Sequence, residues 1–168
     1  GMVLKPEPIW KAVEKQKNKE QKSKRTKSET RVILFSLRGK KFTQKEAKRL
    51  AKYEHLIFIC GRYEGVDERV ARYLADEEIS IGDYVLSGGE LPALVVIEAV
   101  ARHIKGFLGK NESREDIKGS YPVYTRPAVL RTKDRKGKKK ELSAPKALLG
   151  GNHKDIAEWR KAHGKTID

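Results

Sequence analysis

The fold of this chain is decided by one stretch, Ile79–Glu98, which reads Ile-Ser-Ile-Gly-Asp-Tyr-Val-Leu-Ser-Gly-Gly-Glu-Leu-Pro-Ala-Leu-Val-Val-Ile-Glu. It opens with a short alternating apolar run over Ile79–Leu86, which predicts a strand, and this run breaks at Gly88–Gly89. Residues Leu91–Ala101 are then apolar on nearly every side, and a helix of that kind is expected to be buried.

The start of this helix is suited to a ligand. Glu90 places a carboxylate at the positive end of the helix dipole, and Pro92 lacks only an N–H that would have no partner in the first turn. Two glycines before a buried helix let a ligand approach bare backbone N–H groups. The alternative is a tight turn that merely packs, and the stretch alone does not decide between the two.

Two further strands, each followed by a helix, precede this stretch. Both strands are continuous apolar runs, which is typical of buried parallel strands. The predicted elements are, in order, a strand at 32–35, a turn at 36–39, a helix from the capping box Thr43-Gln-Lys-Glu46 to about residue 53, a strand at 56–60, and a helix capped by Asp67 over about residues 68–75.

The alternation of strands and helices, at about 24-residue spacing, predicts an α/β fold with a parallel sheet and right-handed crossovers. Three glycine-bearing loops, at 36–39, 61–65 and 82–89, each leave the carboxyl end of a strand. These ends meet at one edge of the sheet, where open α/β sheets bind ligands. The ligand is not expected to be NAD, because the chain has no G-x-G-x-x-G, and it has no P-loop either.

The other segments contribute less to a core. The lysine-rich loop near the start either contacts phosphate or stays solvated. The expected segments are a helix at 9–20, a polar lysine-rich loop at 17–30, a linker at 105–119, an extended segment at 121–130, a basic loop at 131–141 and a short helix at 155–162.

The composition points to a polyanionic partner. A chain of 168 residues can hold one domain with a real core and a small appendage. Its net charge of +15 favours RNA or DNA over a membrane, although a heat-adapted protein rich in charged residues, here 36%, is the alternative. Residues 1–31 carry ten Lys and Arg against four acids, and residues 131–141 carry seven against two.

Several classes of protein are excluded. A single cysteine rules out a disulfide framework and a cysteine metal cage, and no other residue set predicts a metal site. No apolar run approaches the roughly 18 residues of a membrane span, and no signal peptide opens the chain. We therefore expect a soluble cytoplasmic protein that does not bind membranes.

Two motifs connect the chain to a known family. They are Cys60-Gly-Arg-Tyr-Glu-Gly-Val-Asp-Glu-Arg69 and Ser80-Ile-Gly-Asp-Tyr-Val-Leu-Ser-Gly-Gly-Glu-Leu-Pro92, followed by Ala99-Val-Ala-Arg102, Gly106-Phe-Leu-Gly109, Tyr124-Thr-Arg-Pro127 and Gly151-Asn-His153. In this order they resemble the bacterial tRNA (guanine-37-N1)-methyltransferases, which belong to the knotted SPOUT methyltransferases. The resemblance covers nearly the whole chain.

The chain also departs from this family. The family's first strand and helix, its glycine-rich run before Gly1–Met2 and most of its C-terminal helical domain are missing, so the chain is expected to be truncated at both ends. Leu37–Arg38 stand where the family usually has Pro-Gln, the 131–141 basic segment is extra, and the linker before Asp116 is one residue short. The implied division is a truncated cofactor-binding domain at 1–108, a linker at 109–119 and a partial tRNA-binding domain at 120–168.

The resemblance implies an α/β fold whose parallel sheet carries a deep C-terminal trefoil knot, with a small partial C-terminal segment. It implies methyl transfer from S-adenosyl-L-methionine to N1 of guanosine 37 in tRNA, next to the anticodon, by a homodimer with shared active sites. The cofactor pocket that it implies is formed by Phe35, Ser36, Leu37, Gly39, Gly61, Arg62, Glu64, Ile81, Gly82, Asp83, Tyr84, Val85, Leu86, Gly88 and Gly89.

The chemistry needs two further groups. Guanine N1 carries a proton, so its methylation requires a base for that proton and a cation for the charge that develops on O6. The resemblance assigns the base to Asp116, supplied by the partner subunit, and the guanidinium to Arg102. From the sequence alone, Asp116 is a solvated linker acid and Arg102 an ion-pair partner of Glu98, four residues earlier. Because the linker is short, Glu115 is a second candidate for the base.

Four other residues and two other functions stay open. Cys60 is expected to be a small buried residue and not a nucleophile, and His153 to pack or to contact RNA. Tyr124 and Arg126 are expected either to contact RNA or to serve the structure. The alternative functions are a non-catalytic basic RNA-binding module with a vestigial cofactor pocket and a SPOUT methyltransferase acting on another RNA site.

Overall fold

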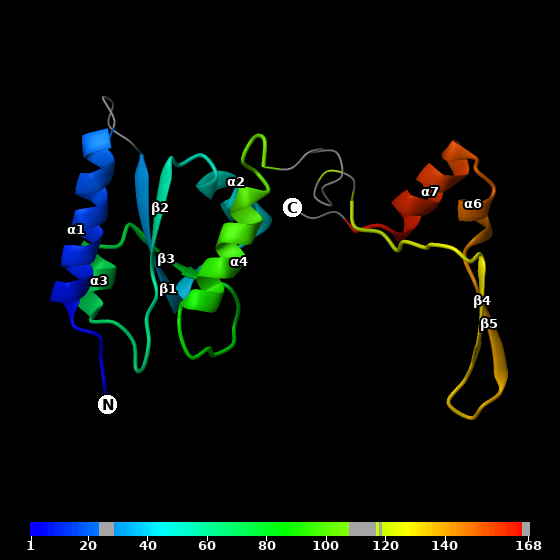
Figure 1. Ribbon diagram of the computed structural model, residues 1–168, viewed down its shortest axis with the longest axis horizontal. Helices are drawn as coiled ribbons and strands as arrows, with labels where there is room; N and C mark the ends of the chain where they lie inside the picture. Colours follow the sequence, from blue (N-terminus) through cyan, green and yellow to red (C-terminus); the bar gives the residue numbers. More distant parts are fainter. Residues whose placement is uncertain (24–28, 108–116, 118, 166–168) are drawn as a thin grey trace. The chain divides into compact units, whose positions relative to one another are not determined.

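The computed structural model describes residues 1–23, 29–107, 117 and 119–165, and of residues 20–23 only the backbone. The chain divides into two compact units, Gly1–Gly109 and Lys110–Asp168. The first unit contains α1 (Pro6–Ser23), β1 (Thr30–Lys41), α2 (Gln44–Leu50), β2 (His55–Ile59), α3 (Glu68–Tyr73), β3 (Glu77–Ser80) and α4 (Glu90–Ala101) (Figure 1).

The first unit is built on a parallel sheet in the order β2-β1-β3, which confirms the predicted α/β class. Thr30–Leu34 of β1 pair with β2, and Ile33–Phe35 pair with β3. Helices α1 and α3 cover one face of the sheet, and α2 and α4 cover the other (Figure 1).

The sheet is held by a hydrophobic core on each face. Successive residues of a strand point to opposite faces, so Val32 and Leu34 join one core and Ile33 joins the other. The buried members are Val13, Val32, Leu34, Ile59, Val70 and Leu74 on the α1 and α3 side, and Ile33, Ala47, Leu50, Ile79, Val96 and Val100 on the α2 and α4 side. The apolar runs of the sequence are therefore buried on both sides, as expected for parallel strands.

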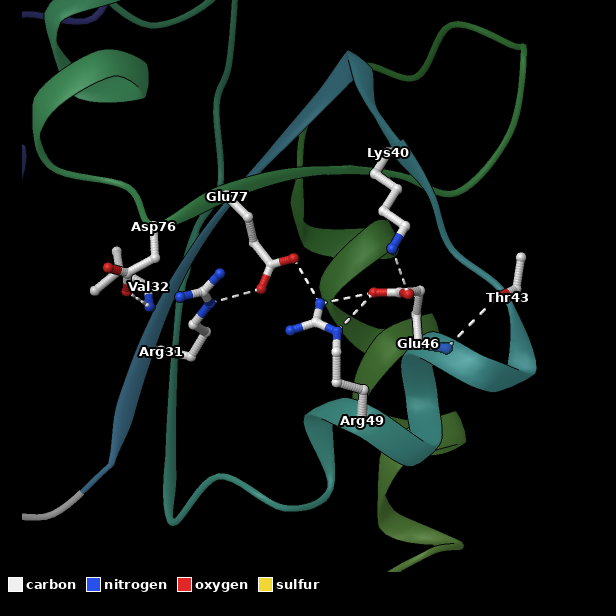
Figure 2. A network of polar contacts seen from close by, with 8 residues as sticks. All are labelled: Arg31, Val32, Lys40, Thr43, Glu46, Arg49, Asp76 and Glu77. Carbon is white, nitrogen blue, oxygen red and sulfur yellow. Dashed lines mark hydrogen bonds and ion pairs between the residues drawn. The ribbon is translucent and has the colours of Figure 1, made fainter.

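The prediction of a turn at 36–39 is wrong, because these residues are extended and belong to β1. The pairing nevertheless shifts there: Ile79 pairs with Phe35 and also with Lys40, five residues further along β1. A strand residue has one hydrogen-bonding edge on each side, so these two partners take opposite edges of Ile79. Figure 2 shows β1 reaching an apex and bending sharply before Lys40, and both arms run parallel to β3.

Two expectations for the central stretch are corrected. The strand predicted over Ile79–Leu86 ends at Ser80, and the chain continues as a loop in which Gly82 has a φ of +156°. The helix expected to be buried all round is covered on one side only, where it packs on the sheet and α2. Its exposed large apolar residues are Leu91, Leu94, Val95 and Ile97.

Both predicted N-caps form, but the capping box does not close. The hydroxyl of Thr43 accepts from the backbone N–H of Glu46 at 3.4 Å, and the carboxylate of Asp67 accepts from that of Arg69 at 2.9 Å. The side chain of Glu46 accepts instead from Lys40 at 2.6 Å and from Arg49 at 2.7 Å (Figure 2). Glu46 is 3% exposed, so this network satisfies a buried carboxylate.

The second unit contains β4 (Val129–Lys133), β5 (Lys139–Ser143), α6 (Lys146–Leu149) and α7 (His153–His163). The basic loop expected at 131–141 is wrong, since these residues form an antiparallel hairpin of β4 and β5. The short C-terminal helix is confirmed as α7, which begins after the cap residue Asn152, and α6 was not expected. In the first unit, α1 begins earlier and ends later than the predicted helix at 9–20.

Candidate functional site

A pocket of about 500 Å³ lies at the carboxyl ends of the three parallel strands. Its walls come from residues 34–38 of β1, from residues 61–66 after β2, and from the end of β3 and the residues that follow it up to Gly89. These are the three loops that the strand order had placed on one edge. The volume lies within the range of about 300–1,000 Å³ that is usual for small-molecule sites.

Most residues of the expected cofactor site line this pocket. Those that do are Phe35, Ser36, Leu37, Gly61, Arg62, Glu64, Ile81, Gly82, Tyr84, Leu86, Gly88 and Gly89. Three others do not line it. Gly39 lies against the backbone of β3, Asp83 pairs with Lys41 at 3.0 Å, and the side chain of Val85 is 82% exposed.

An ion-pair cluster that was not predicted from the sequence forms part of the wall. The guanidinium of Arg38 donates to Glu68, the first residue of α3, at 2.8 Å and lies 3.7 Å from Glu78 of β3. All three side chains line the pocket. The hydrogen bond from Arg38 lowers the pKa of Glu68, so this carboxylate stays charged. The only signal in the sequence was Arg38 itself, at a position where the chain departs from the family pattern.

A second ion pair joins the other two loops. The guanidinium of Arg62 donates to Glu90, in the first turn of α4, at 2.7 Å, and this hydrogen bond lowers the pKa of Glu90. The backbone supports the link, since the N–H of Gly89 donates to the carbonyl of Gly61 at 3.0 Å. A Cβ at Gly88 would lie 2.9 Å from Nε of Arg62. The glycine therefore leaves room for this ion pair.

The lining can hold a small polar ligand that carries positive charge. Glu64, Glu68 and Glu78 outnumber the two guanidinium groups among the lining residues, and both guanidinium groups are already paired with carboxylates. Carboxylates accept hydrogen bonds from hydroxyl and ammonium groups. Apolar side chains such as Leu86 provide a surface for a flat ring.

The two residues expected to act on the substrate are not placed in this pocket. Arg102 is the C-cap residue of α4 and pairs with Glu98 at 2.5 Å, which is the ion pair considered from the sequence. At a rise of about 1.5 Å per residue, the helix separates Arg102 from Gly89 by roughly 20 Å. Asp116 and its alternative Glu115 lie outside the described residues.

The remaining candidates have plain structural surroundings. Burial raises the pKa of the Cys60 thiol, which opposes reactivity. The ring of Tyr124 contacts Trp159 edge-on at 6.1 Å, whereas Arg126 and His153 are exposed.

Within the described ranges, no three His, Cys, Asp or Glu residues are grouped to hold a metal ion. No helix in those same ranges has both the length and the hydropathy to cross a membrane.

The fold and the pocket define an α/β domain with a pocket of ligand size at the carboxyl edge of a parallel sheet. The family model for tRNA (guanine-1)-methyltransferase TrmD matches residues 1–167, so the chain belongs to this family, as its motifs predicted.

Curated relatives agree with this assignment. The chain is 48% identical over 165 residues to the tRNA (guanine-N(1)-)-methyltransferase of Bacillus subtilis (strain 168). It is 47% identical over 165 residues to the proteins of the same name from Bacillus cereus (strain AH820) and Bacillus anthracis (strain A0248). Each match covers 95% of this chain and 62% of the relative. The chain therefore spans less than two thirds of the length of these relatives.

Proposed function

We propose that this chain is part of an enzyme that transfers a methyl group from S-adenosyl-L-methionine to N1 of guanosine 37 in tRNA. The observation that carries the proposal is the meeting of three loops, at the edge where α/β sheets bind ligands, in a chain of the tRNA (guanine-1)-methyltransferase family. The names of the relatives give the base and the atom, and the net charge of +15 suits a tRNA partner.

The pocket fits S-adenosyl-L-methionine in size and in charge. When bound, this cofactor supplies the methyl group. Glu64, Glu68 and Glu78 offer acceptors for its hydroxyl and ammonium groups, and their excess negative charge suits its cationic sulfur. The backbone of Gly88 and Gly89 lines the wall without side chains in the way. We assign the pocket residues as the cofactor site on this basis.

Two residues of this chain are proposed to act on the guanine. The carboxylate of Asp116 accepts the N1 proton, and the guanidinium of Arg102 donates to O6 as negative charge develops there. Arg102 already holds a carboxylate, that of Glu98, on an exposed surface where a substrate oxygen can compete for it. Its planar fork suits an oxygen acceptor better than an ammonium would.

A homodimer with shared active sites is supported by two features of α4. Its outward face exposes Leu91, Leu94 and Ile97 at 59%, 60% and 47%, and an unpartnered apolar face of this kind is typical of a subunit interface. The roughly 20 Å of helix between the pocket and Arg102 prevents one subunit from bringing them together. A partner subunit whose α4 packs against this apolar face would supply the groups that one subunit cannot bring to its own pocket.

The finer description of the fold is also proposed. A trefoil knot is supported by the pairing of Ile79 with both Phe35 and Lys40, because β3 then lies between two arms of one strand. We propose a cofactor-binding domain at 1–108, a linker at 109–119 and a tRNA-binding part at 120–168, acting in the cytoplasm.

The decisive experiment is methyl transfer to tRNA. Purified chain, labelled S-adenosyl-L-methionine and a tRNA transcript with guanosine 37 should give 1-methylguanosine at that position, and a transcript with adenosine 37 should give none. Methylation at another position would favour a methyltransferase for a different RNA site. Binding of tRNA without any binding of the cofactor in calorimetry would favour a non-catalytic RNA-binding module.

A further inference from the structure

The hairpin of β4 and β5 has a well-defined turn. The two strands pair from Val129 with Ser143 at one end to Lys133 with Lys139 at the other. The connection between them passes through Gly137, whose φ is +79°. The carboxylate of Asp134 accepts from the N–H groups of Lys136 and Lys138 at 2.8 and 2.9 Å. The backbone geometry of the tip is therefore fixed by hydrogen bonds within the tip itself.

The charges of the hairpin work against its own folding. Lys133 lies directly opposite Lys139, and like charges at opposed positions of an antiparallel pair are destabilising. The acids do not relieve this, because Asp134 is bound to backbone N–H groups in the turn and Glu141 pairs with Arg131 at 2.8 Å. Among the described residues, no ion pair engages the cations of the tip, which are Lys133, Arg135, Lys136, Lys138, Lys139 and Lys140.

Packing gives no reason for the hairpin either. Every residue of both strands is exposed, including Leu130 at 51% and Leu142 at 43%. An isolated two-stranded hairpin is marginally stable at best in water. A segment that breaks local rules without a structural gain is expected to serve a function.

We propose that the hairpin tip, Lys133–Lys140, binds the phosphate backbone of tRNA outside the methylated nucleotide. This rests on the proposed function and names the surface that meets the substrate. Phosphates would relieve the repulsion between Lys133 and Lys139. Residues 129–143 contain no aromatic side chain, and binding to unpaired bases relies on aromatic stacking. The hairpin therefore contacts phosphates and not bases, and it raises affinity without taking part in methyl transfer.

The variant Lys139→Glu separates binding from folding. It places a carboxylate opposite Lys133, so it favours the hairpin while removing positive charge from the tip. We expect the affinity for tRNA at 150 mM salt to fall about fivefold or more, with a smaller salt slope. The control is Lys45→Glu on α2, which changes the net charge equally at an exposed site of the first unit and should leave the affinity within about twofold.

Replacement of Lys136, Lys138, Lys139 and Lys140 by alanine in the full chain tests the magnitude. The slope of log affinity against log salt should fall by roughly 2.8–3.6, since each of the four lost phosphate contacts removes about 0.7–0.9. At saturating tRNA, kcat for methyl transfer should be retained while KM rises.

The outcomes distinguish this inference from the proposed function. Unchanged affinity, slope and KM in both variants would overturn the hairpin inference and leave the methyltransferase proposal standing. Absence of methyl transfer by the parent chain, together with hairpin-dependent tRNA binding, would overturn only the proposed function. Binding to phosphatidylserine vesicles that depends on the hairpin, without such dependence for tRNA, would assign the hairpin to a membrane surface and overturn the inference.

Discussion

Gly39 lies directly against the backbone of Ile79. A Cβ at Gly39 would come within 2.5 Å of the backbone nitrogen of Ile79 and 2.6 Å of the carbonyl carbon of Glu78. The β3 backbone cannot move aside, because Ile79 is 1% exposed and is paired on both edges by β1. Only glycine allows the chain to cross β3 at this point.

We predict that Gly39→Ala destabilises the first unit by about 1–3 kcal/mol, the usual cost of overpacking a well-packed site. The measurement is urea unfolding followed by circular dichroism. Gly61→Ala is the control in the same unit, because its new methyl group would meet a side-chain methyl of Val66 at 3.1 Å and not a backbone. If Gly39→Ala were as stable as the parent, the close passage of β1 over the backbone of β3 at Gly39 would be contradicted.

Gly88→Val should abolish binding of S-adenosyl-L-methionine. The new side chain would displace Arg62 from Glu90 and fill the wall of the pocket. Calorimetry should give no measurable heat for the variant, while its thermal unfolding stays cooperative. Val85→Ala is the control, since that side chain is 82% exposed and does not line the pocket. Parent-like affinity in Gly88→Val would place the cofactor elsewhere.

The polar network around Glu46 should make stability depend on pH in the acid range (Figure 2). Burial acts to raise the pKa of Glu46, but hydrogen bonds from Lys40 and Arg49 outweigh it, so the pKa is lowered. Its stabilising contribution is thus complete above the unfolded pKa of about 4.5 and is lost as the pH falls through the lower folded value. The free energy of unfolding should fall below about pH 4.5.

Glu46→Gln tests this assignment. At pH 7 it should cost about 1–3 kcal/mol, because three charge-assisted hydrogen bonds are weakened, and its stability should fall less steeply in acid than that of the parent. Glu141→Gln, which removes a carboxylate that is 61% exposed, is the control and should change neither quantity measurably. A parent-like acid profile for Glu46→Gln would mean that other carboxylates set the pH dependence.

Leu94→Glu should convert a dimer into a monomer. The residue is 60% exposed on the apolar face of α4, and a carboxylate there would be buried without a partner if two such faces met. Sedimentation velocity at micromolar concentration measures the change. Tyr73→Glu, at a residue of α3 that is 72% exposed, is the control and should remain dimeric. A monomeric parent chain would remove the basis for shared active sites.

Asp116→Asn should reduce the rate of methyl transfer by roughly 10²–10⁴-fold while leaving cofactor affinity unchanged, because an amide cannot accept the N1 proton. Single-turnover measurements isolate this step. Arg102→Lys should also lose methyl transfer, since an ammonium lacks the planar fork of the guanidinium. Glu115→Gln should be mild. The opposite pattern, loss with Glu115→Gln and activity with Asp116→Asn, would identify Glu115 as the base.

The sheet and its pocket could be predicted from the sequence because the signals are local. The run Val32–Phe35 is apolar at every position, which fits a strand covered on both faces, and glycines mark the loops that leave the strands. Strand order then places those loops on one edge without any knowledge of packing. Twelve of the expected cofactor residues line the pocket for that reason.

The rest depends on contacts between residues that are distant in sequence. Arg38 and Glu68 are 30 positions apart, and neither has a neighbour that predicts their ion pair. The hairpin escaped prediction because its strands are charged and carry no clear alternation. The burial of α4 was overestimated because hydropathy gives the character of a face but not what covers it.

The position of Ile79 between Phe35 and Lys40 imposes an order on the folding of the first unit. Residues Thr30–Leu34 can pair with β2 as soon as both have been synthesised, but the second arm of β1 must wait for residues 77–80. Residues 36–38 of β1, which join the two arms, line the pocket, so the pocket is completed late. Contacts that span some 40 residues are slow to form, and recovery of ligand binding during refolding should therefore lag behind recovery of helical structure.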